Sequence, residues 1–449
     1  RPFDRVSRSL VYARAKKQED AHPFGTELDV YSEEYEALCH SINPNPKAPK
    51  RTRVHVGTDQ CSKPYDAARL NISAMSFGAL GNHAIEALNM GAKIGDFYHD
   101  TGEGGLSKYH LKHGGDVVWE LGSGYFGARD KDGNFDPESF RDKAQHDAVK
   151  MTEIKLSQGA KPGHGGILPG PKVSEAIAEA RGVPVGKACV SPASHSAFSS
   201  PRGLCDFIAR LRELSAGKPV GIKLCIGHPW EWFAMAKAFQ ETEIAPDFIV
   251  VDGGEGGTGA APVEFADHKG APLREGLMLV HNTLTGLGIR DRIKLIASAK
   301  IITAFDICRI SALGADGVNM GRGFMFAIGC IQAQACHTGK CPTGITTQDP
   351  GRYRALVVPD KAQRVARFHK ATMFALKEAC ESSGLSHPDA FTPHHLMIRT
   401  GPREVRSAAS LYDWLKPGAL LQGDVDHPAF RKYWHRARIG DWGIAEAAW

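Results

Sequence analysis

Short apolar runs alternate with longer amphipathic segments through the middle of the chain. Eight of these runs are mostly apolar or β-branched, which is typical of buried parallel strands. They lie at residues 70–77, 96–100, 151–156, 188–191, 220–226, 247–252, 293–297 and 316–320. Helical periodicity separates several of them, at residues 175–181, 202–214, 230–241 and 304–313.

Eight strands with intervening helices over about 250 residues predict an α/β fold, a (β/α)8 TIM barrel rather than a doubly wound sheet. We assign the barrel to residues 61–350. Residues 1–60 form a polar N-terminal extension, and residues 351–449 form a C-terminal helical extension with an amphipathic helix at 360–383. Both extensions are expected to wrap the barrel.

Four glycine-rich turns follow predicted strands, which is where a barrel carries its active site. They are SFG at 76–78, TGEGG at 101–105, QGAKPGHGG at 158–166 and DGGEGGTG at 252–259. One such turn is ordinary loop chemistry. Four on one rim indicate a large planar ligand that lies against the backbone.

A fifth glycine turn, Gly321-Arg322-Gly323, joins the last predicted strand to an apolar helix start. A strand–glycine–helix junction exposes backbone amides and a positive helix terminus, which suits a phosphate group. Arg322 would add a charged, forked contact. Taken alone, this junction is weak evidence, because many glycine turns bind nothing.

Three cysteines, Cys330, Cys336 and Cys341, form a C-x5-C-x4-C pattern within the loop 329–350. Thiolates this close in sequence can converge on one soft metal centre. Three thiolates without a fourth favour an iron–sulfur cluster with an open corner, such as a three-iron cluster. Zinc with His337 as the fourth ligand, and a disulfide beside a free thiol, are the alternatives.

Composition narrows the class of protein. With 42% hydrophobic and 23% charged residues, the 449-residue chain is globular. The net charge of +5 is small for a chain of this size, so it does not indicate a nucleic-acid-binding protein. Ten unevenly spaced cysteines suit a reducing compartment, so we expect a cytoplasmic protein. No run is apolar enough to span a membrane. Since the first residue is Arg1, not Met, a leader, an anchor or a preceding domain that was removed or left out is a further expectation. An anchor of this kind would make the protein membrane-associated.

The motifs HDTGEGG, KLSQGAKPGHGGILPG, DGGEGGTGAAP and CHTGKCPTGITTQDP resemble the FMN-binding synthase domain of glutamate synthase. The similarity covers residues 60–350, and the chain ends resemble stand-alone FMN-binding glutamate synthase family proteins. The family implies a (β/α)8 barrel, bound FMN and a 3Fe–4S cluster held by three cysteines. Here these would be Cys330, Cys336 and Cys341.

The resemblance also implies roles for single residues. Glu103 and Lys161 would be catalytic, with Glu103 as proton donor or orienting group. Gln158, Lys161 and Arg181 would face the substrate. The implied FMN contacts are Met75, Ser76, Gln158, Lys223, Gly254, Gly256, Gly257, Ser298, Gly321 and Arg322. Lys223 interrupts an apolar strand, so it needs a partner: either the N1/O2 edge of the flavin or an internal salt bridge.

The sequence departs from the large glutamate synthases at two places. His164 and Ile167 stand where those enzymes typically carry an acid and an amide. Because an apolar side chain cannot replace the hydrogen bond of that amide, these residues argue against 2-oxoglutarate as the natural substrate. The turn after the seventh predicted strand reads Ser298-Ala299-Lys300, where glycine would be typical. The chain also shows no glutaminase nucleophile and no NADPH fingerprint.

The resemblance predicts an iron–sulfur flavoprotein oxidoreductase that acts on the CH–NH2 group. It would reduce an imino acid derived from 2-oxoglutarate to glutamate. Electrons would come from an external donor, a ferredoxin or a reductase subunit, and ammonia from a separate subunit. The alternatives are a reductase of a different keto or imino acid and a non-catalytic electron-transfer subunit. Self-association into a homo-oligomer is left open.

Overall fold

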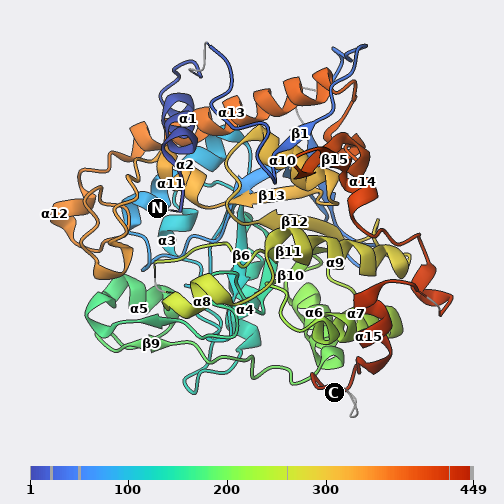
Figure 1. Ribbon diagram of the computed structural model, residues 1–449. Coiled ribbons are helices and arrows are strands. Elements are labelled where there is room, and N and C mark those ends of the chain that lie inside the picture. The colour runs from blue at the N-terminus through green and yellow to red at the C-terminus, as the bar shows by residue number, and fades with distance from the viewer. Residues whose placement is uncertain (1, 21–23, 49–51, 260, 424, 445–449) are drawn as a thin grey trace.

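The computed structural model describes residues 2–20, 24–48, 52–259, 261–423 and 425–444. Eight parallel strands close into a barrel (Figure 1). Each strand pairs with the barrel strand that precedes it in the chain and with the one that follows it. The strands are β4 (Leu70–Ile72), β5 (His99–Asp100), β6 (Val117–Leu121), β7 (Val149–Lys155), β10 (Val220–Leu224), β11 (Phe248–Asp252), β12 (Lys294–Ser298) and β13 (Gly317–Met320). The predicted (β/α)8 barrel is therefore confirmed.

Helices on the outside connect these strands. They are α2 (Asn82–Gly95), α3 (Lys108–Leu111), α4 (Pro137–Ala144), α5 (Glu175–Arg181), α6 (Pro201–Leu214), α7 (Pro229–Thr242), α8 (Val263–His268), α9 (Leu273–Gly286), α10 (Ala304–Ala312) and α11 (Arg322–Ala327). Local chemistry fixes where they begin. In α6, for example, Ser200 accepts a hydrogen bond from the amide of Gly203, and Pro201 occupies the first turn.

One predicted barrel strand is wrong. Residues 188–191 do not join the barrel; within them, β9 (Cys189–Val190) pairs antiparallel with β8 (Ile167–Leu168) in a two-stranded ribbon between β7 and α6. The strand that completes the barrel is β6, which the sequence analysis missed. All five residues of β6 are buried, but Glu120 interrupts its apolar pattern. A buried glutamate is tolerated there because a lysine from another strand pairs with it.

The barrel interior has an apolar layer under a polar one. The apolar layer contains Tyr98, Val118, Met151, Phe248, Val250 and Ile296. Val54, Val56 and Ala67 of the hairpin β2 (Arg53–Val56) and β3 (Tyr65–Ala68) pack against this layer. Thr58, just after β2, donates to Asp247 directly before β11, and Tyr65 of β3 donates to Asp116 directly before β6, so the hairpin covers the amino-terminal end of the barrel. The polar layer lies toward the carboxyl ends of the strands.

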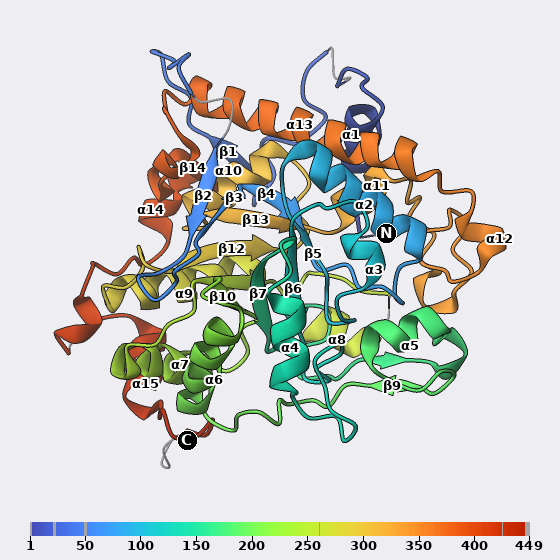
Figure 2. The same cartoon turned by 180° about the vertical axis from the view of Figure 1, so that it is seen from behind.

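The two chain extensions pack against the barrel helices and each other (Figures 1 and 2). Helix α1 (Arg5–Ala15) contacts α11 and the long helix α13 (Val358–Ser382). Strand β1 (Glu36–Leu38) joins β14 (Leu396–Gly401) and β15 (Glu404–Ser407) in an antiparallel sheet. The remaining helices are α12 (Pro350–Tyr353), α14 (Ala408–Leu411) and α15 (Pro428–Tyr433). Within the described ranges, no helix has the length and apolarity needed to cross a membrane.

Candidate active site

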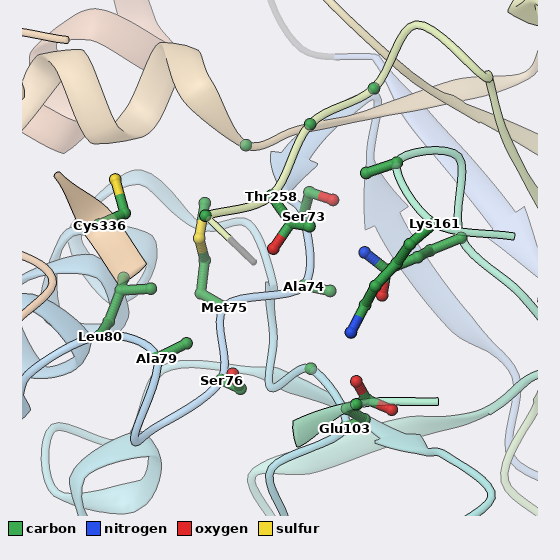
Figure 3. Close-up of a pocket in the computed structure, with 18 of the residues that line it drawn as sticks. Ser73, Ala74, Met75, Ser76, Ala79, Leu80, Glu103, Lys161, Thr258 and Cys336 are labelled. Atoms are coloured by element: carbon green, nitrogen blue, oxygen red, sulfur yellow. The ribbon is translucent and has the colours of Figure 1, made fainter. Parts of the chain in front are cut away.

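A cleft of about 360 Å³ opens at the carboxyl ends of the barrel strands (Figure 3). The strand-end turns predicted to form the site line it. Of the residues predicted to be catalytic or to bind substrate or FMN, twelve contribute to its wall: Met75, Ser76, Glu103, Gln158, Lys161, Arg181, Lys223, Gly256, Gly257, Ser298, Gly321 and Arg322. The exception in this set is Gly254, which lines the neighbouring cavity instead.

Glu103 is the anion at the centre of a group of cations. A carboxylate oxygen of Glu103 lies 3.0 Å from Nζ of Lys155, which also donates to Oε1 of Gln158 at 2.5 Å. Burial acts to raise the pKa of Glu103, but Lys155, Lys161 and Arg181 together lower it to about 2. The side chain is therefore ionised at neutral pH. Of its two predicted roles, the geometry favours an orienting group over a proton donor.

Lys161 and Arg181 bring buried positive charge to the same side of the cleft. Lys161 is only 7% exposed, and this burial lowers its pKa. Arg181 is the last residue of α5, but it is not a surface arginine, because it is 6% exposed. Its guanidinium donates to the carbonyl of Phe77 at 3.3 Å and lies 4.9 Å from the centre of the Phe126 ring. Two cations held this rigidly suit a carboxylate ligand.

Lys223 lies on the cleft floor and pairs with a carboxylate from a neighbouring part of the barrel. Its Nζ is 2.6 Å from Oε2 of Glu120, and both side chains are buried. Burial acts to lower the pKa of Lys223, but Glu120 and the nearby carboxylates outweigh it, so the pKa lies well above its ordinary value. The internal salt bridge is thus present, and Lys223 also reaches the cleft.

The turns after β12 and β13 form the far wall. Helix α11 starts at Arg322 directly after Gly321. Lys300, after β12, has a φ of +43°, a left-handed conformation that favours glycine. This explains why glycine is typical at that turn, and it shows that this chain uses a lysine there under strain. A Cβ on Gly257 would lie 3.3 Å from the Arg322 guanidinium, so the glycine leaves that cation open to the cleft.

The three predicted cluster ligands, Cys330, Cys336 and Cys341, line one cavity of about 750 Å³ and are all free thiols. Hydrogen bonds from Thr343 and Thr346 outweigh burial and lower the pKa of Cys341 to about 7. In the part of the chain that the structure describes, the one group of three side chains whose ligand atoms lie within 4.8 Å of each other contains no cysteine. The sulfurs are therefore spaced more widely than around a single small ion.

This cavity adjoins the cleft. Thr258, Arg322 and Cys336 line both spaces, and Figure 3 shows Thr258 and Cys336 on the same side of the cleft as Met75. The alternative fourth ligand, His337, also lines both. A group bound by the cysteines would therefore lie next to a group bound in the cleft.

Among the cleft residues that were not predicted as site residues are Glu120, Lys155 and Lys300. A usable signal existed for Lys155, because it ends β7 three residues before the glycine-rich turn at 158–166, and it pairs in register with Lys223 of the next strand of the barrel. Of the two departures from the large synthases, Ile167 lines the cleft and is 58% exposed. His164 is exposed and contacts the ring of Phe265.

Residues 13–386 match the family described as "Conserved region in glutamate synthase". The chain is 42% identical over 346 residues to the glutamate synthase large subunit-like protein YerD of Bacillus subtilis strain 168, covering 77% of this chain and 66% of that protein. It is 34% identical over 344 residues to an archaeal-type NADPH glutamate synthase of Thermotoga maritima, covering 76% and 63%. The matches span less than two thirds of these relatives' lengths.

Among solved structures, a flavocytochrome b2 variant with benzoylformate has the same fold, with a TM-score of 0.50 at 11% identity. The alignment covers 95% of this chain and 86% of the flavocytochrome chain. At this identity the likeness concerns the barrel alone. The family match extends over most of the chain, from the end of α1 through α13, and includes every strand that lines the cleft. The chain therefore belongs to the glutamate synthase family.

Proposed function

We propose that this protein is an FMN- and iron–sulfur-dependent oxidoreductase of glutamate synthase type. It would reduce the imino acid formed from 2-oxoglutarate and ammonia to glutamate, acting on the CH–NH2 group. The observation that carries the proposal is the ionised Glu103 beside Lys155, with Lys161 and Arg181 on the same wall of a barrel cleft. Such a site can hold carboxylates and a cationic nitrogen together.

The cleft fits FMN. Glycines at 102, 256, 257 and 321 keep its wall free of side chains; a Cβ at Gly102 would lie 2.9 Å from the Ser76 amide nitrogen. Lys300 and Arg322 are cations at the strand ends where a phosphate would lie. Met75, Ser76, Gln158, Lys223 and Ser298 are the proposed further contacts, and Gly254 is the weakest, because it lines only the neighbouring cavity. When bound, FMN supplies hydride transfer.

The cysteine cavity fits a 3Fe–4S cluster. Three free thiols face one space without a fourth cysteine, and their wide spacing suits a cluster better than one zinc ion. Cys330, Cys336 and Cys341 would be the ligands, and the cluster would supply single electrons from an external donor, a ferredoxin or a reductase subunit. Ammonia would come from a separate subunit. We propose a cytoplasmic location.

The chain's own residues would bind and orient the substrate. Lys161 and Arg181 would hold the carboxylates, because both are buried cations with donors aimed into the cleft. Glu103 would accept the N–H of the imine and stabilise its protonated form, which is the better hydride acceptor. Lys161, whose pKa burial lowers, lines the same cleft and would give the imine nitrogen its proton before the hydride arrives.

The experiment is a rapid mixing of reduced protein with 2-oxoglutarate and ammonium under anaerobic conditions. Flavin reoxidation with stoichiometric glutamate is expected, and Lys161→Ala should abolish it. If only a neutral acceptor reoxidises the flavin, the substrate class is wrong. If no small molecule does so while the flavin still exchanges electrons with a protein donor, the chain is an electron-transfer subunit.

One observation favours a second substrate. Ile167 is exposed to the cleft at a position where a polar contact would be needed for 2-oxoglutarate. A lost hydrogen bond to a charged group costs about 1.5–3 kcal/mol. A keto or imino acid with an apolar group at that point would therefore bind better. Ile167→Gln should tighten 2-oxoglutarate by roughly tenfold to a hundredfold, and an unchanged affinity would place this side chain outside the substrate's reach.

A further inference from the structure

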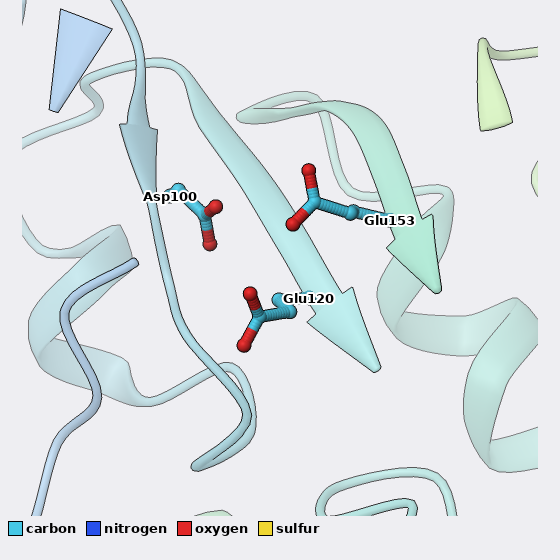
Figure 4. Close-up of side chains that lie close together, drawn as sticks. All are labelled: Asp100, Glu120 and Glu153. Atoms are coloured by element: carbon cyan, nitrogen blue, oxygen red, sulfur yellow. The ribbon is translucent and has the colours of Figure 1, made fainter. Parts of the chain in front are cut away.

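Below the cleft floor, three carboxyl groups from adjacent strands converge inside the barrel (Figure 4). Asp100 ends β5, Glu120 lies in β6 and Glu153 lies in β7. Each offers an oxygen within 4.8 Å of the others, and their exposures are 1%, 2% and 0%. We call this group the carboxyl triad. Neither FMN binding nor substrate chemistry, as proposed above, uses Asp100 or Glu153.

The triad holds more acid groups than its cations can balance. Lys223 pairs with Glu120 at 2.6 Å. Asp100 accepts a hydrogen bond from the amide of Gly102 through Oδ1, but its Oδ2 and both oxygens of Glu153 have no hydrogen-bond partner among the described residues. An ionised carboxylate buried without a donor is strongly unfavourable. Because Lys223 is already paired with Glu120, it does not neutralise Asp100 and Glu153, and these two carboxyl groups are expected to carry protons instead.

The surrounding charges reinforce this need. The other titratable groups that act on the triad or on Lys223 are Tyr98 directly before β5, Lys155 on β7 and Asp252 on β11. Lys155 pairs with Glu103 in the cleft, and the hydroxyl of Tyr98 donates to Asn319 rather than to a carboxylate. Burial and the charge of Glu120 raise the pKa of Asp100 to about 7, while burial and Asp100 raise that of Glu153 well above its ordinary value.

We propose that the carboxyl triad is a buried proton store that is linked through Lys223 to the cleft floor. It keeps a proton on Glu153 and exchanges a second one at Asp100. When negative charge develops against Lys223, Asp100 takes up a proton from solvent and forms one O–H bond. When the charge leaves, that proton returns to solvent. The link rests on the proposed function, because two-electron reduction of FMN, with one proton bound by the flavin itself, supplies the charge.

The store can be tested without FMN. Infrared spectra of the flavin-free protein from pH 5 to pH 9 should show a protonated carboxyl carbonyl band that falls in part near pH 7. Asp100→Asn should remove the pH-dependent part, and Glu153→Gln should remove the constant part. Glu86→Gln is the matched control, because Glu86 is also buried but pairs with Lys112 at 2.9 Å; it should change neither. A band unaffected by both triad variants would overturn the proposal, as would one tightly bound metal ion per chain that both variants lose.

The link to the cleft is tested by the flavin midpoint potential as a function of pH. Each proton taken up with two electrons contributes ~30 mV per pH unit. The wild type should show about 60 mV per pH unit between pH 7 and pH 8, and Asp100→Asn about half of that slope. Equal slopes would overturn the link. A chain that binds no FMN but shows the expected infrared bands would instead refute the proposed function and leave the store intact.

Discussion

Replacing Lys155 with methionine is the sharpest test of the electrostatics of the cleft. Lys155 is the largest of the charges that hold the pKa of Glu103 at about 2 rather than its ordinary 4.5. That fall of about 2.5 units corresponds to about 3 kcal/mol at 1.36 kcal/mol per unit. Both side chains are mostly buried, at 10% and 21% exposure, so solvent screens the pair little.

In Lys155→Met, Lys161 and Arg181 remain near Glu103. We therefore expect its pKa to rise by about 1 to 2 units, and the free energy of unfolding at pH 7 to fall by about 1 to 3 kcal/mol. The stabilisation by an acid whose pKa is lowered is fully present above pH 4.5 and is lost as the pH falls toward 2. The difference between wild type and variant should shrink over that range.

The assay is an infrared or carbon-13 titration of labelled glutamate side chains, with the Glu103 signal assigned by its loss in Glu103→Gln. At pH 3 the wild-type carboxylate should be mostly ionised and the variant at least half protonated. Lys108→Met is the control, because it breaks the exposed pair of Lys108 with Glu179 and should leave Glu103 unchanged. If Glu103 stays as ionised at pH 3 in Lys155→Met as in the wild type, the assigned cause of its low pKa is wrong.

Four further predictions address other parts of the molecule. Cys336→Ser should lose iron and acid-labile sulfide while Cys39→Ser retains them; stoichiometric zinc without sulfide in the wild type would exclude the cluster. Lys223→Met should lower the flavin potential or weaken FMN binding, measured by redox titration and fluorescence, and no change in either would leave the residue a purely structural partner. Lys300→Gly should relieve about 1 kcal/mol of backbone strain but stabilise the unfolded chain through its entropy by about 0.4–1 kcal/mol. The free energy of unfolding should therefore hardly change, whereas FMN should bind more weakly because a cation is lost. Burial lowers the pKa of His369 to about 4, so its contribution to stability is present above pH 6.5 and lost as the pH falls toward 4; His369→Gln should flatten the unfolding free energy over that range, and an unchanged slope would contradict the assignment.

The sequence predicted the barrel because strand spacing and strand-end glycines are local patterns. It failed at β6, where Glu120 interrupts the apolar run. The partner that makes this glutamate acceptable, Lys223, is 103 residues further along the chain. It also could not separate Arg181 from an ordinary surface arginine, because the contacts that bury it, Phe77 and Phe126, come from other loops. Tertiary contacts, which one sequence does not display, account for both failures. The roles of the site residues themselves stay predictions.

The docking of the first dozen residues over the cysteine loop has a consequence for how the protein assembles. The hydroxyl of Tyr12 donates to the carbonyl of Cys330 at 2.5 Å, and the backbone of Phe3 exchanges two hydrogen bonds with the side chain of Gln332. These contacts join residues 318 and 329 positions apart. During synthesis the N-terminal segment must wait until almost three quarters of the chain has emerged, and such distant contacts form late. Loading of the proposed cluster can therefore precede closure, and the segment that carries Phe3 and Tyr12 would cover the loop last.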